Sequence, residues 1–351
     1  MAILPSYTGG GAERVLLNFI VNAKNKKIEY KLFVANATGP LKNNSFKEKI
    51  EFKYKRFLIS VPSLLKEIKK NKIDILISTF PHTSVTILLL KAIKIINCKI
   101  IIRQPNMIEV SLSRTKKLKI LKYFYKKTIR YADTLIVTSE EMRKESTKFK
   151  IMKNRVFLLK NPININTMRK GLVPKRKRNT RVNLVFVGRL AYQKGLDRIL
   201  YSIKQANNVY LAIIGEGEEK SNLERTVNTF KIQKRVDFLG YIERPFELIA
   251  GADYFILPSR WEGLPNSALE SLALGTPVIA FSDVVALKDY KKNISNKSIT
   301  ILDSTTQLND KLKILYRRVD YKKPKLRKNL LHNSLSIKQY QNKLNKIIMN
   351  V

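Results

Sequence analysis

Short apolar runs alternate with longer amphipathic segments along the whole chain. Runs that are apolar throughout indicate strands buried on both faces, and apolar residues that recur every three or four positions indicate helices with one buried face. A β-α-β-α order of this kind is typical of a parallel sheet covered by helices on both sides. In the first half the pattern predicts strands at Ile3–Leu4, Tyr30–Ala35, Phe57–Ile59, Ile73–Ser78, Lys99–Ile102, Thr134–Thr138 and Arg155–Lys160, with helices at Ala12–Ala23, Ser63–Lys70, Ser84–Ile96, Thr115–Arg130 and Glu140–Phe149.

The rhythm of strands and helices is interrupted between residues 161 and 181. This stretch contains Pro162, Pro174 and a basic run at 175–178, a composition typical of an interdomain linker. The rhythm then restarts, which indicates a second domain of similar size. The second set of predicted elements comprises strands at Asn183–Val187, Val209–Ile214, Val236–Leu239, Tyr254–Leu257, Pro277–Ala280 and Ser298–Leu302, with helices at Lys194–Gln205, Glu218–Lys231, Pro245–Gly251, Asn266–Leu274, Leu312–Tyr316 and Ile337–Met349.

We therefore predict an α/β protein of two doubly wound, Rossmann-like domains. The predicted boundaries are 1–165 for the first domain, 166–181 for a basic linker, 182–330 for the second domain and 331–351 for a C-terminal helix. Open parallel sheets bind ligands beyond the carboxyl ends of their strands. Two such domains that face each other place the expected site in a central cleft.

Composition excludes several classes of protein. The chain has 351 residues, and at 44% hydrophobic it is not a disordered protein. Its one cysteine, Cys98, excludes a disulfide framework and a cysteine-based zinc site, and its two histidines, His82 and His332, argue against a His-rich metal site. The most apolar stretch, 85–102, is interrupted by lysines, and the N-terminal residues lack the pattern of a signal peptide. We therefore expect a cytoplasmic protein.

The formal net charge of +41 is distributed unevenly. Residues 1–178 carry 40 Lys and Arg against 11 Asp and Glu, residues 179–310 carry 16 against 15, and residues 311–351 carry 12 against 1. A uniform coding bias does not explain a neutral middle segment, so the asymmetry favours an anionic partner for the first half and the tail. The alternative is a set of solvated lysines on helix faces. A nucleic-acid-binding protein is a second reading of the charge, but no recognisable binding motif accompanies it.

Glycines and cations follow several predicted strands. Gly9-Gly10-Gly11 lies between the first strand and a helix, where free backbone amides suit an anion; the alternative is a simple turn. Gly188-Arg189-Leu190 follows the first strand of the second domain, and Lys194 stands at the start of the next helix, so two cations converge where a diphosphate would fit. Two merely exposed cations are the alternative there. Gly215-Glu216-Gly217 either lines a nucleotide pocket or starts the following helix.

The densest block of candidate residues runs from Pro258 to Glu270. Glu262 is expected in a loop after an apolar strand, and Asn266 is expected to cap the helix that carries Glu270 one turn in. Carboxylates are natural acceptors for sugar hydroxyls, and amides at a helix N-terminus suit phosphate. The alternative is that the two glutamates occur at this spacing by chance. The Gly263-Leu264-Pro265 sequence between them and the preceding strand argue against that alternative.

The block from Glu262 to Glu270 resembles the Glu-x7-Glu motif of the retaining glycosyltransferases of family 4, which have the GT-B fold. The resemblance covers nearly the whole chain and is most specific from Val182 to Phe281. Other matching stretches, in chain order, are Gly9-Gly10-Gly11-Ala12-Glu13-Arg14-Val15, Val187-Gly188-Arg189-Leu190 with Gln193-Lys194-Gly195, Ile214-Gly215-Glu216-Gly217, Phe238-Leu239-Gly240-Tyr241 and Leu274-Gly275-Thr276-Pro277-Val278.

The resemblance implies a role for each matched residue. Arg189 and Lys194 would neutralise the donor diphosphate, and Glu262 would contact the donor sugar, which makes these three the catalytic set. Glu270 would hold the ribose hydroxyls. The substrate-binding set comprises Gly10, Gly11, Arg103, Asn106, Gly188, Gly215, Glu216, Tyr241, Ile242, Ser259, Gly263, Leu264, Pro265, Asn266 and Glu270. In this fold the C-terminal helix usually crosses back to the first domain, which binds the acceptor.

Three departures from the family pattern stand out. The opening strand is short, and the segment after the strand at 278–280 reads Phe281-Ser282-Asp283-Val284 without the family's glycine. A histidine common in the first domain is replaced by Arg103-Gln104-Pro105-Asn106, which makes Arg103 and Asn106 candidate contacts to acceptor or donor. These departures leave a degenerate, non-catalytic family member as an alternative.

As a whole, the resemblance implies transfer of a sugar from a nucleotide-sugar donor, a UDP-hexose or UDP-N-acetylhexosamine, to a glycan or lipid-linked acceptor of cell-surface polysaccharide. No metal and no other cofactor is expected. The basic first domain and tail would dock peripherally on the inner face of the anionic cytoplasmic membrane, with the basic and aromatic segment 116–127 as the best candidate patch; an ordinary amphipathic helix is the alternative.

Overall fold

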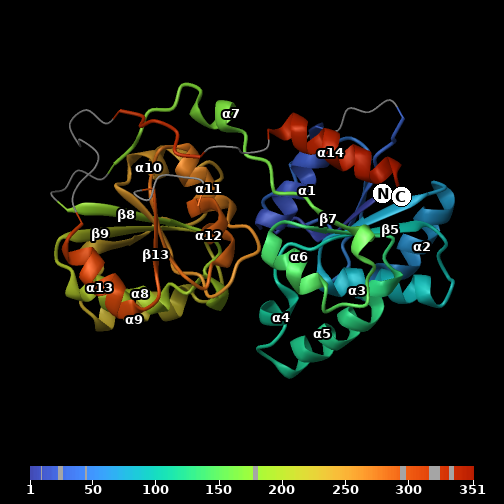
Figure 1. Ribbon diagram of the computed structural model, residues 1–351, viewed down its shortest axis with the longest axis horizontal. Coiled ribbons are helices and arrows are strands. Elements are labelled where there is room, and N and C mark those ends of the chain that lie inside the picture. Colours follow the sequence, from blue (N-terminus) through green and yellow to red (C-terminus); the bar gives the residue numbers. More distant parts are fainter. Residues whose placement is uncertain are drawn as a thin grey trace. The chain divides into compact units, whose positions relative to one another are not determined.

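The computed structural model describes the chain apart from residues 9, 23–26, 44–45, 177–180, 293–297, 316–324 and 332–335. The chain folds into two α/β units (Figure 1). The first consists of Met1–Pro162 with Leu335–Val351, and the second consists of Ile163–Ser334. In the described part of the chain each unit contains one sheet whose neighbouring strands are all parallel. The predicted fold class is confirmed.

The first sheet has the strand order β3-β2-β1-β4-β5-β6-β7. Its strands are β1 (Ala2–Ser6), β2 (Leu32–Asn36), β3 (Lys49–Glu51), β4 (Ile75–Ser78), β5 (Lys99–Arg103), β6 (Thr134–Val137) and β7 (Val156–Leu158). Although β1 is short, it lies between β2 and β4, and its Ala2, Ile3 and Leu4 are buried. Alternate residues point to opposite faces, so that Leu4 belongs to one buried cluster and Ile3 to the other.

Helices cover both faces of the first sheet. One face packs against α1 and α14, and the other packs against α2, α3, α5 and α6. The helices of this unit are α1 (Gly11–Asn22), α2 (Val61–Lys70), α3 (Pro81–Ala92), α4 (Ile108–Ser111), α5 (Lys116–Thr128), α6 (Glu140–Ser146) and α14 (Ile337–Met349), with short 3₁₀ helices η1 (Phe57–Ser60), η2 (Ile129–Tyr131) and η3 (Lys153–Arg155).

The second sheet has the strand order β10-β9-β8-β11-β12-β13. Its strands are β8 (Val182–Val187), β9 (Val209–Ile214), β10 (Val236–Phe238), β11 (Tyr254–Leu257), β12 (Val278–Phe281) and β13 (Ile299–Leu302). Its helices are α7 (Ile165–Arg169), α8 (Asp197–Gln205), α9 (Lys220–Thr229), α10 (Phe246–Gly251), α11 (Asn266–Ala273), α12 (Val285–Lys292) and α13 (Thr305–Lys313), with η4 (Tyr192–Lys194) and η5 (Gln233–Arg235). One face packs against α8, α9 and α13, and the other packs against α10, α11 and α12.

One predicted strand is wrong. Phe57–Ile59 forms η1, and the strand beside β2 is β3. Phe57 is buried whereas Leu58 and Ile59 are 67% and 56% exposed, so the apolar run has no second sheet neighbour to cover it. The Ser60 hydroxyl donates to the carbonyl of Phe57 at 2.6 Å, which favours the helical turn over an extended strand.

The basic linker predicted at 166–181 is packed into the second unit as far as the structure describes it. Its first residues form α7, and Met168 is buried. Arg176 pairs with Asp253 at 2.8 Å, and both side chains are almost fully buried, at 1% and 0% exposure. The sequence pattern did not predict this ion pair. A run of basic residues shows where the positive charges lie, but it does not show that Asp253, 77 positions away, pairs with Arg176.

The C-terminal helix α14 belongs to the first unit. Tyr340 and Leu344 are buried in the same cluster as α1, and the Tyr340 ring meets the edge of Phe19 with centroids 6.3 Å apart. The Tyr30 hydroxyl donates to the side-chain oxygen of Asn345 at 2.5 Å. Among the described residues, no helix is both long and apolar enough to cross a membrane.

Candidate functional site

The second sheet reverses its winding direction between β8 and β11, which are neighbours in space but far apart in sequence. At such a switch point the loops at the carboxyl ends of the two strands leave toward opposite faces, and a crevice forms between them. The segment after β8 carries Gly188, Arg189 and Lys194, and the segment after β11 carries Ser259 and Glu262. The topology therefore brings the two predicted segments to one edge of the sheet.

Lys194, Ser259 and Glu262 form a connected polar cluster at this edge. The Lys194 Nζ lies 2.5 Å from Glu262 Oε1, and the Ser259 hydroxyl donates to the same oxygen at 2.7 Å. The Glu262 side chain is 6% exposed and that of Lys194 is 19% exposed. A carboxylate this buried is held in one orientation by the ammonium and the hydroxyl, so its position is fixed before any ligand arrives.

Gln193, which the sequence analysis left out of the site, completes the cluster. Its side-chain amide donates to the carbonyl of Trp261 at 2.9 Å and approaches Glu262 Oε2 at 3.5 Å. The backbone of the next loop is tied in the same way, because the Arg260 amide donates to the Gln193 carbonyl at 2.8 Å. The sequence signal was available, since Gln193 directly precedes Lys194.

Gly195 lets the two loops touch. It adopts a φ of +65°, and a Cβ there would lie 2.2 Å from the carbonyl oxygen of Pro258. Gly215 has a φ of +144°, and a Cβ on it would lie 1.9 Å from the carbonyl oxygen of Gly188. Gly195 therefore permits backbone contact with Pro258, and Gly215 permits backbone contact with Gly188; a side chain at either glycine would block that contact.

Arg189 differs from Lys194 in its surroundings. Its side chain is exposed, and within the described chain neither an ion pair nor a side-chain hydrogen bond engages it. It follows the carboxyl end of β8, five positions before Lys194. The site thus combines one pre-positioned cation, bound to Glu262, with one that is free to meet an anion.

The helix α11 begins at the far side of the Glu262 loop. Its cap position is Pro265, and Asn266 is its first residue, so the predicted capping role of Asn266 is wrong. The difference is one residue, and the fixed ring of Pro265 suits the turn that precedes the helix. Gly263, Leu264 and Pro265 are buried, and Glu270 lies one turn into α11, partly buried.

The remaining candidates of the second unit lie along the ends of β9 and β10. Glu216 is exposed and pairs with Lys220 at 2.9 Å. Tyr241 is 42% exposed, whereas Ile242 is partly buried and packs against the core cluster of the second unit. Glu216 lies near the end of β10, because a Cβ on Gly240 would stand 3.2 Å from its Oε1.

Two ion pairs that the sequence analysis missed brace the site. Arg260 binds both carboxylate oxygens of Asp197, at 2.8 and 2.6 Å. Burial alone would raise the pKa of Asp197, but the hydrogen bonds from Arg260 hold it below its ordinary value. Arg198 pairs with Asp283 at 2.7 Å, which anchors the glycine-free segment after β12 to α8. Side chains so far apart in sequence carry no local signal that they pair.

In the first unit, Gly10 and Gly11 lie at the start of α1, and Gly11 is its first residue. The carboxylate of Glu13 is buried and turned back over them, since a Cβ on Gly10 would lie 2.5 Å from Glu13 Oε2. The Thr8 hydroxyl donates to Glu13 Oε1 at 2.7 Å. The expected anion-binding helix terminus therefore already holds a carboxylate of its own chain.

Arg103 ends β5 as a buried cation, 3% exposed. Its Nη2 donates to the side-chain oxygen of Asn161 at 2.6 Å, but its Nε and Nη1 are buried without a hydrogen-bond partner. No acidic side chain in the described chain pairs with it. The segment that follows, with the partly buried Asn106, is held by Glu145, which accepts from the Gln104 side chain at 3.0 Å and from the Ile108 and Glu109 amides at 2.9 and 2.8 Å.

Across the described residues, no group of three or more His, Cys, Asp or Glu side chains is arranged to hold a metal ion. Burial raises the pKa of Glu145, although hydrogen bonds from neighbouring amides oppose that change. The predicted site residues at the edge of the second sheet include two cations, Arg189 and Lys194.

Comparisons with known protein families match both units. Residues 170–333 match the family model described as glycosyl transferases group 1, and residues 9–167 match the model described as glycosyltransferase family 4. Together the two models span most of the chain, and they meet near the boundary between the two units.

Similarity to individual curated proteins is mostly partial. An uncharacterized glycosyltransferase of Methanocaldococcus jannaschii is 35% identical over 45% of this chain and 41% of its own length. The O-antigen biosynthesis glycosyltransferase WclY of Escherichia coli is 31% identical over 33% of this chain and 34% of its own length. The chain thus matches less than half the length of these relatives.

Two other relatives match over nearly their whole length. A Campylobacter jejuni enzyme named as a GalNAc-α-(1→4)-GalNAc-α-(1→3)-diNAcBac-PP-undecaprenol α-1,4-N-acetyl-D-galactosaminyltransferase is 26% identical over 92% of this chain and 89% of its own. A crystal structure of Anabaena HepE in complex with UDP-glucose aligns with a TM-score of 0.78 at 14% identity over 100% of this chain and 99% of its own. At that identity the structural match shows the fold alone, which is GT-B.

Proposed function

Because this chain belongs to the family 4-like glycosyltransferases of the GT-B superfamily, we propose that it transfers a sugar from a nucleotide-sugar donor to a glycan acceptor in cell-surface polysaccharide synthesis. The observation that carries the proposal is the cluster of Lys194, Ser259 and Glu262 at the switch point of the second sheet. There the chain offers a fixed carboxylate to a sugar and cations to a diphosphate.

The chemistry we propose depends on stabilising a leaving group. As the bond between the sugar and the diphosphate breaks, negative charge grows on the diphosphate. Lys194 and the unengaged Arg189 would neutralise that charge. Glu262 would then accept hydrogen bonds from the donor sugar, and Glu270 from the ribose. The attacking group is an acceptor hydroxyl, and the configuration of the sugar is retained, as is usual in this family.

The donor we propose is a UDP-hexose or UDP-N-acetylhexosamine. Support comes from the solved GT-B structures that this chain resembles, of which the Anabaena HepE structures contain UDP or UDP-glucose. We also propose that transfer needs no divalent metal, because Arg189 and Lys194 supply the positive charge that a metal would otherwise bring. Turnover that disappears with EDTA and returns with Mg²⁺ or Mn²⁺ would contradict this.

The acceptor we propose is a lipid-linked glycan, reached by docking on an anionic membrane surface. The Campylobacter relative is named for an undecaprenol-diphosphate-linked acceptor. In this chain, α5 presents the exposed residues Ile120, Tyr123 and Phe124 together with exposed lysines at 116, 117, 119 and 127. An apolar and basic helix face is suited to the interface of a bilayer that contains anionic lipids.

The proposed function is tested with a panel of nucleotide-sugars, with released nucleotide detected by mass spectrometry. We expect release from one UDP-sugar, and we expect Glu270→Ala to abolish it while the thermal unfolding temperature stays unchanged. The matched control is Glu218→Ala, because Glu218 is an exposed acid of the same unit. Undiminished turnover in Glu270→Ala would refute the assigned site.

A further inference from the structure

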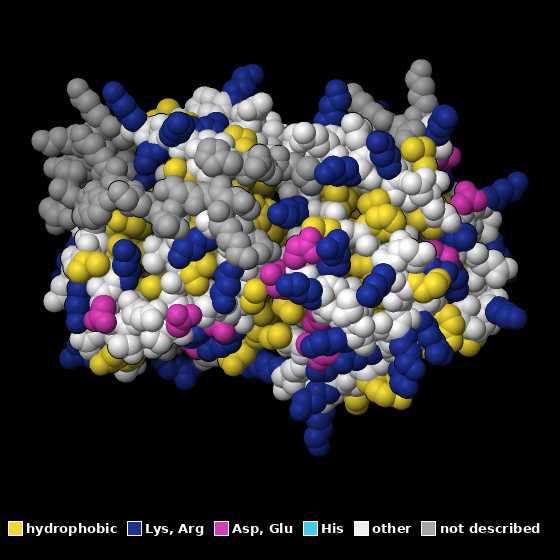
Figure 2. Space-filling view, viewed as in Figure 1, with side chains coloured by type: hydrophobic (Ala, Val, Ile, Leu, Met, Phe, Trp, Pro, Cys, Tyr) yellow, Lys and Arg dark blue, Asp and Glu magenta, His cyan; other side chains and the backbone are white. Residues whose placement is uncertain are grey.

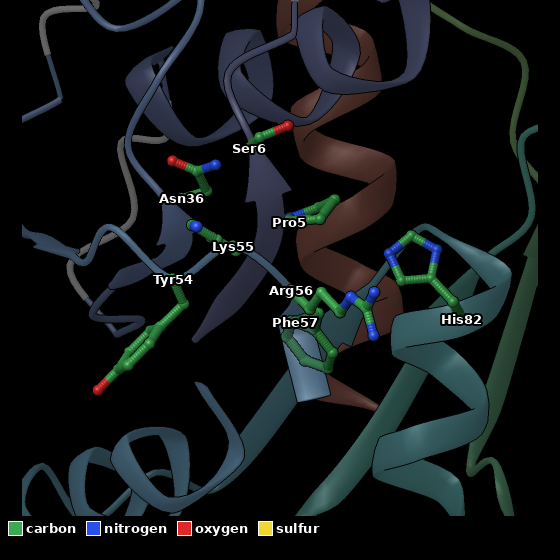
Figure 3. A pocket seen from close by; sticks show the side chains of 8 residues that line it. All are labelled: Pro5, Ser6, Asn36, Tyr54, Lys55, Arg56, Phe57 and His82. Atoms are coloured by element: carbon green, nitrogen blue, oxygen red, sulfur yellow. The ribbon is translucent and has the colours of Figure 1, made fainter. Parts of the chain in front are cut away.

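Two adjoining cavities open in the first unit. The first has a volume of about 330 Å³ and lies at the carboxyl ends of β1 and β2, where Ser6 and Asn36 line it with Lys55 (Figure 3). Ligands of open parallel sheets bind at this end of the strands. Apolar side chains form part of its wall, but Ser6, Asn36 and Lys55 bring polar and cationic groups to it, so it offers hydrogen bonds and charge to a hydroxylated, anionic ligand.

The second cavity has a volume of about 390 Å³ and is almost wholly apolar. It lies among η1, α3 and α5, and its apolar lining includes Leu58, Val85, Leu89, Leu121 and Phe124. Leu58, Leu89 and Phe124 are 67%, 40% and 43% exposed, so the cavity continues into an apolar rim. Apolar side chains gathered at the surface of a soluble unit indicate a binding site for an apolar group.

Arg56, Phe57 and His82 line both cavities and therefore mark their junction. The Arg56 guanidinium extends toward the imidazole of His82 in Figure 3. Arg56 is exposed, and none of the described acidic side chains forms an ion pair with it. His82 is exposed, although nearby atoms partly desolvate it and lower its pKa below the ordinary 6.5. A guanidinium stays charged at any working pH, so the fixed positive charge at the junction is that of Arg56.

We propose that the two cavities form one acceptor site for a polyisoprenyl phosphate or diphosphate that carries a sugar. The hydrocarbon chain would lie in the apolar cavity, the phosphate would bind Arg56 at the junction, and the first sugar would enter the first cavity beside Asn36 and Lys55. An apolar cavity, a cation and a cavity with hydrogen-bonding side chains thus follow one another in the order of tail, phosphate and sugar in such a lipid. This inference rests on the proposed function, which supplies the glycan acceptor.

The observations favour a single lipid chain over a flat membrane contact. A bilayer surface needs only an exposed apolar and basic face, such as that of α5, whereas these residues enclose a concave space that reaches the edge of the sheet. A free phosphate or a nucleotide would leave the apolar half unused. The membrane face of α5 and the apolar cavity share Phe124, so a lipid could pass from the bilayer into the site without crossing water.

The test is calorimetric titration of the full chain with farnesyl diphosphate, inorganic diphosphate and farnesol. We expect saturable binding of farnesyl diphosphate and much weaker binding of the other two. Arg56→Gln and Leu89→Gln should each weaken that binding about tenfold, through loss of a charge-assisted hydrogen bond or of apolar contact. The matched controls Arg130→Gln and Ile93→Gln change exposed residues of the same unit outside both cavities and should have no effect.

UDP titration of the same variants separates this inference from the proposed function. Unchanged UDP binding in Arg56→Gln and Leu89→Gln shows that the donor site is intact, and an unchanged thermal unfolding profile shows that the first unit of both variants is folded. Equal binding of farnesyl and inorganic diphosphate, or full farnesyl diphosphate binding in both cavity variants, would overturn the lipid site while leaving the proposed transferase intact. Loss of donor turnover in Glu270→Ala concerns the proposed function alone.

Discussion

Lys194 illustrates how one side chain serves the site in two ways. It fixes the buried Glu262 carboxylate at 2.5 Å and also brings a positive charge to the edge of the second sheet. Arg189, exposed and unengaged within the described chain, supplies charge alone. The two cations are therefore not equivalent, although the sequence presents them as a similar pair.

Lys194→Met is expected to lower turnover by about 10²–10³-fold, because it removes charge stabilisation from the leaving group and leaves Glu262 with the Ser259 hydroxyl and the longer contact to Gln193. Turnover of the best UDP-sugar is measured under saturating conditions. Lys234→Met is the matched control, since Lys234 is an exposed lysine of the same unit outside the candidate site. Equal turnover in the two variants would contradict the role of Lys194.

Substitution of Arg103 distinguishes a role in stability from a role in sugar transfer. Its buried Nε and Nη1 have no partner, so the positive charge is costly to the folded state. We expect Arg103→Met to leave the unfolding temperature unchanged or raised and to reduce transfer to acceptor. Thermal unfolding and turnover are measured on the same sample. A clear loss of stability with normal transfer would show that Arg103 is only structural.

At the scale of elements, the loop that follows β8 owes its contacts with the loops after β11 and β9 to glycine. Gly195 lies against Pro258 after β11, and Gly215, after β9, lies against Gly188; at both positions a Cβ would lie about 2 Å from a carbonyl oxygen. The neighbouring segment at 163–176 is held by different means, because its basic residues find partners inside the second unit. Lys175, for example, pairs with Glu247 at 2.5 Å.

Asp253→Asn is expected to destabilise the second unit by about 3 kcal/mol, because it leaves the fully buried Arg176 without its counter-charge. Chemical denaturation of the full chain measures the loss. Asp310→Asn, which alters an exposed pair with Lys313 at 3.9 Å, should change the free energy of unfolding by less than about 0.5 kcal/mol. Similar effects of the two substitutions would refute the structural role of Arg176.

At the scale of the whole molecule, the net positive charge is divided between the two units more evenly than the sequence segments suggested. The first unit carries 37 Lys and Arg against 11 Asp and Glu, and the second carries 31 against 16, or +26 and +15. The neutral stretch at 179–310 is flanked by basic segments that belong to the same unit. Figure 2 shows basic side chains spread over both units rather than gathered on one. Net charge alone therefore does not select a membrane face, and we propose α5 for that role because it combines exposed lysines with exposed aromatic residues.

Flotation with vesicles of phosphatidylglycerol and phosphatidylcholine tests this docking. Binding should rise with phosphatidylglycerol content and fall with salt, since each basic residue near such a surface contributes about 1 kcal/mol. The variant Lys116→Glu with Lys119→Glu should bind weakly. The control Lys231→Glu with Lys234→Glu makes the same change in net charge on exposed residues of the second unit and should bind normally. Equal loss in both variants would mean that only net charge matters.

The sequence by itself determined the α/β class, the approximate division into two units and most strands, because apolar runs and helical periodicity are local signals. Val209–Ile214 and Tyr254–Leu257 have the predicted bounds. It also singled out Lys194 and Glu262, since the family motif preserves their neighbours in the chain. The Phe57–Ile59 strand failed because an apolar run does not reveal whether a sheet neighbour will cover it.

Only the tertiary structure decided which distant side chains meet. It paired Arg176 with Asp253, turned Glu13 back over the α1 terminus, buried Arg103 without a counter-charge and placed two cavities on either side of Arg56. These features depend on long-range packing, and a residue's type and immediate neighbours do not encode the partner that packing brings to it. The sequence therefore determined which candidate residues the site contains, and the tertiary structure determined which side chains surround each of them.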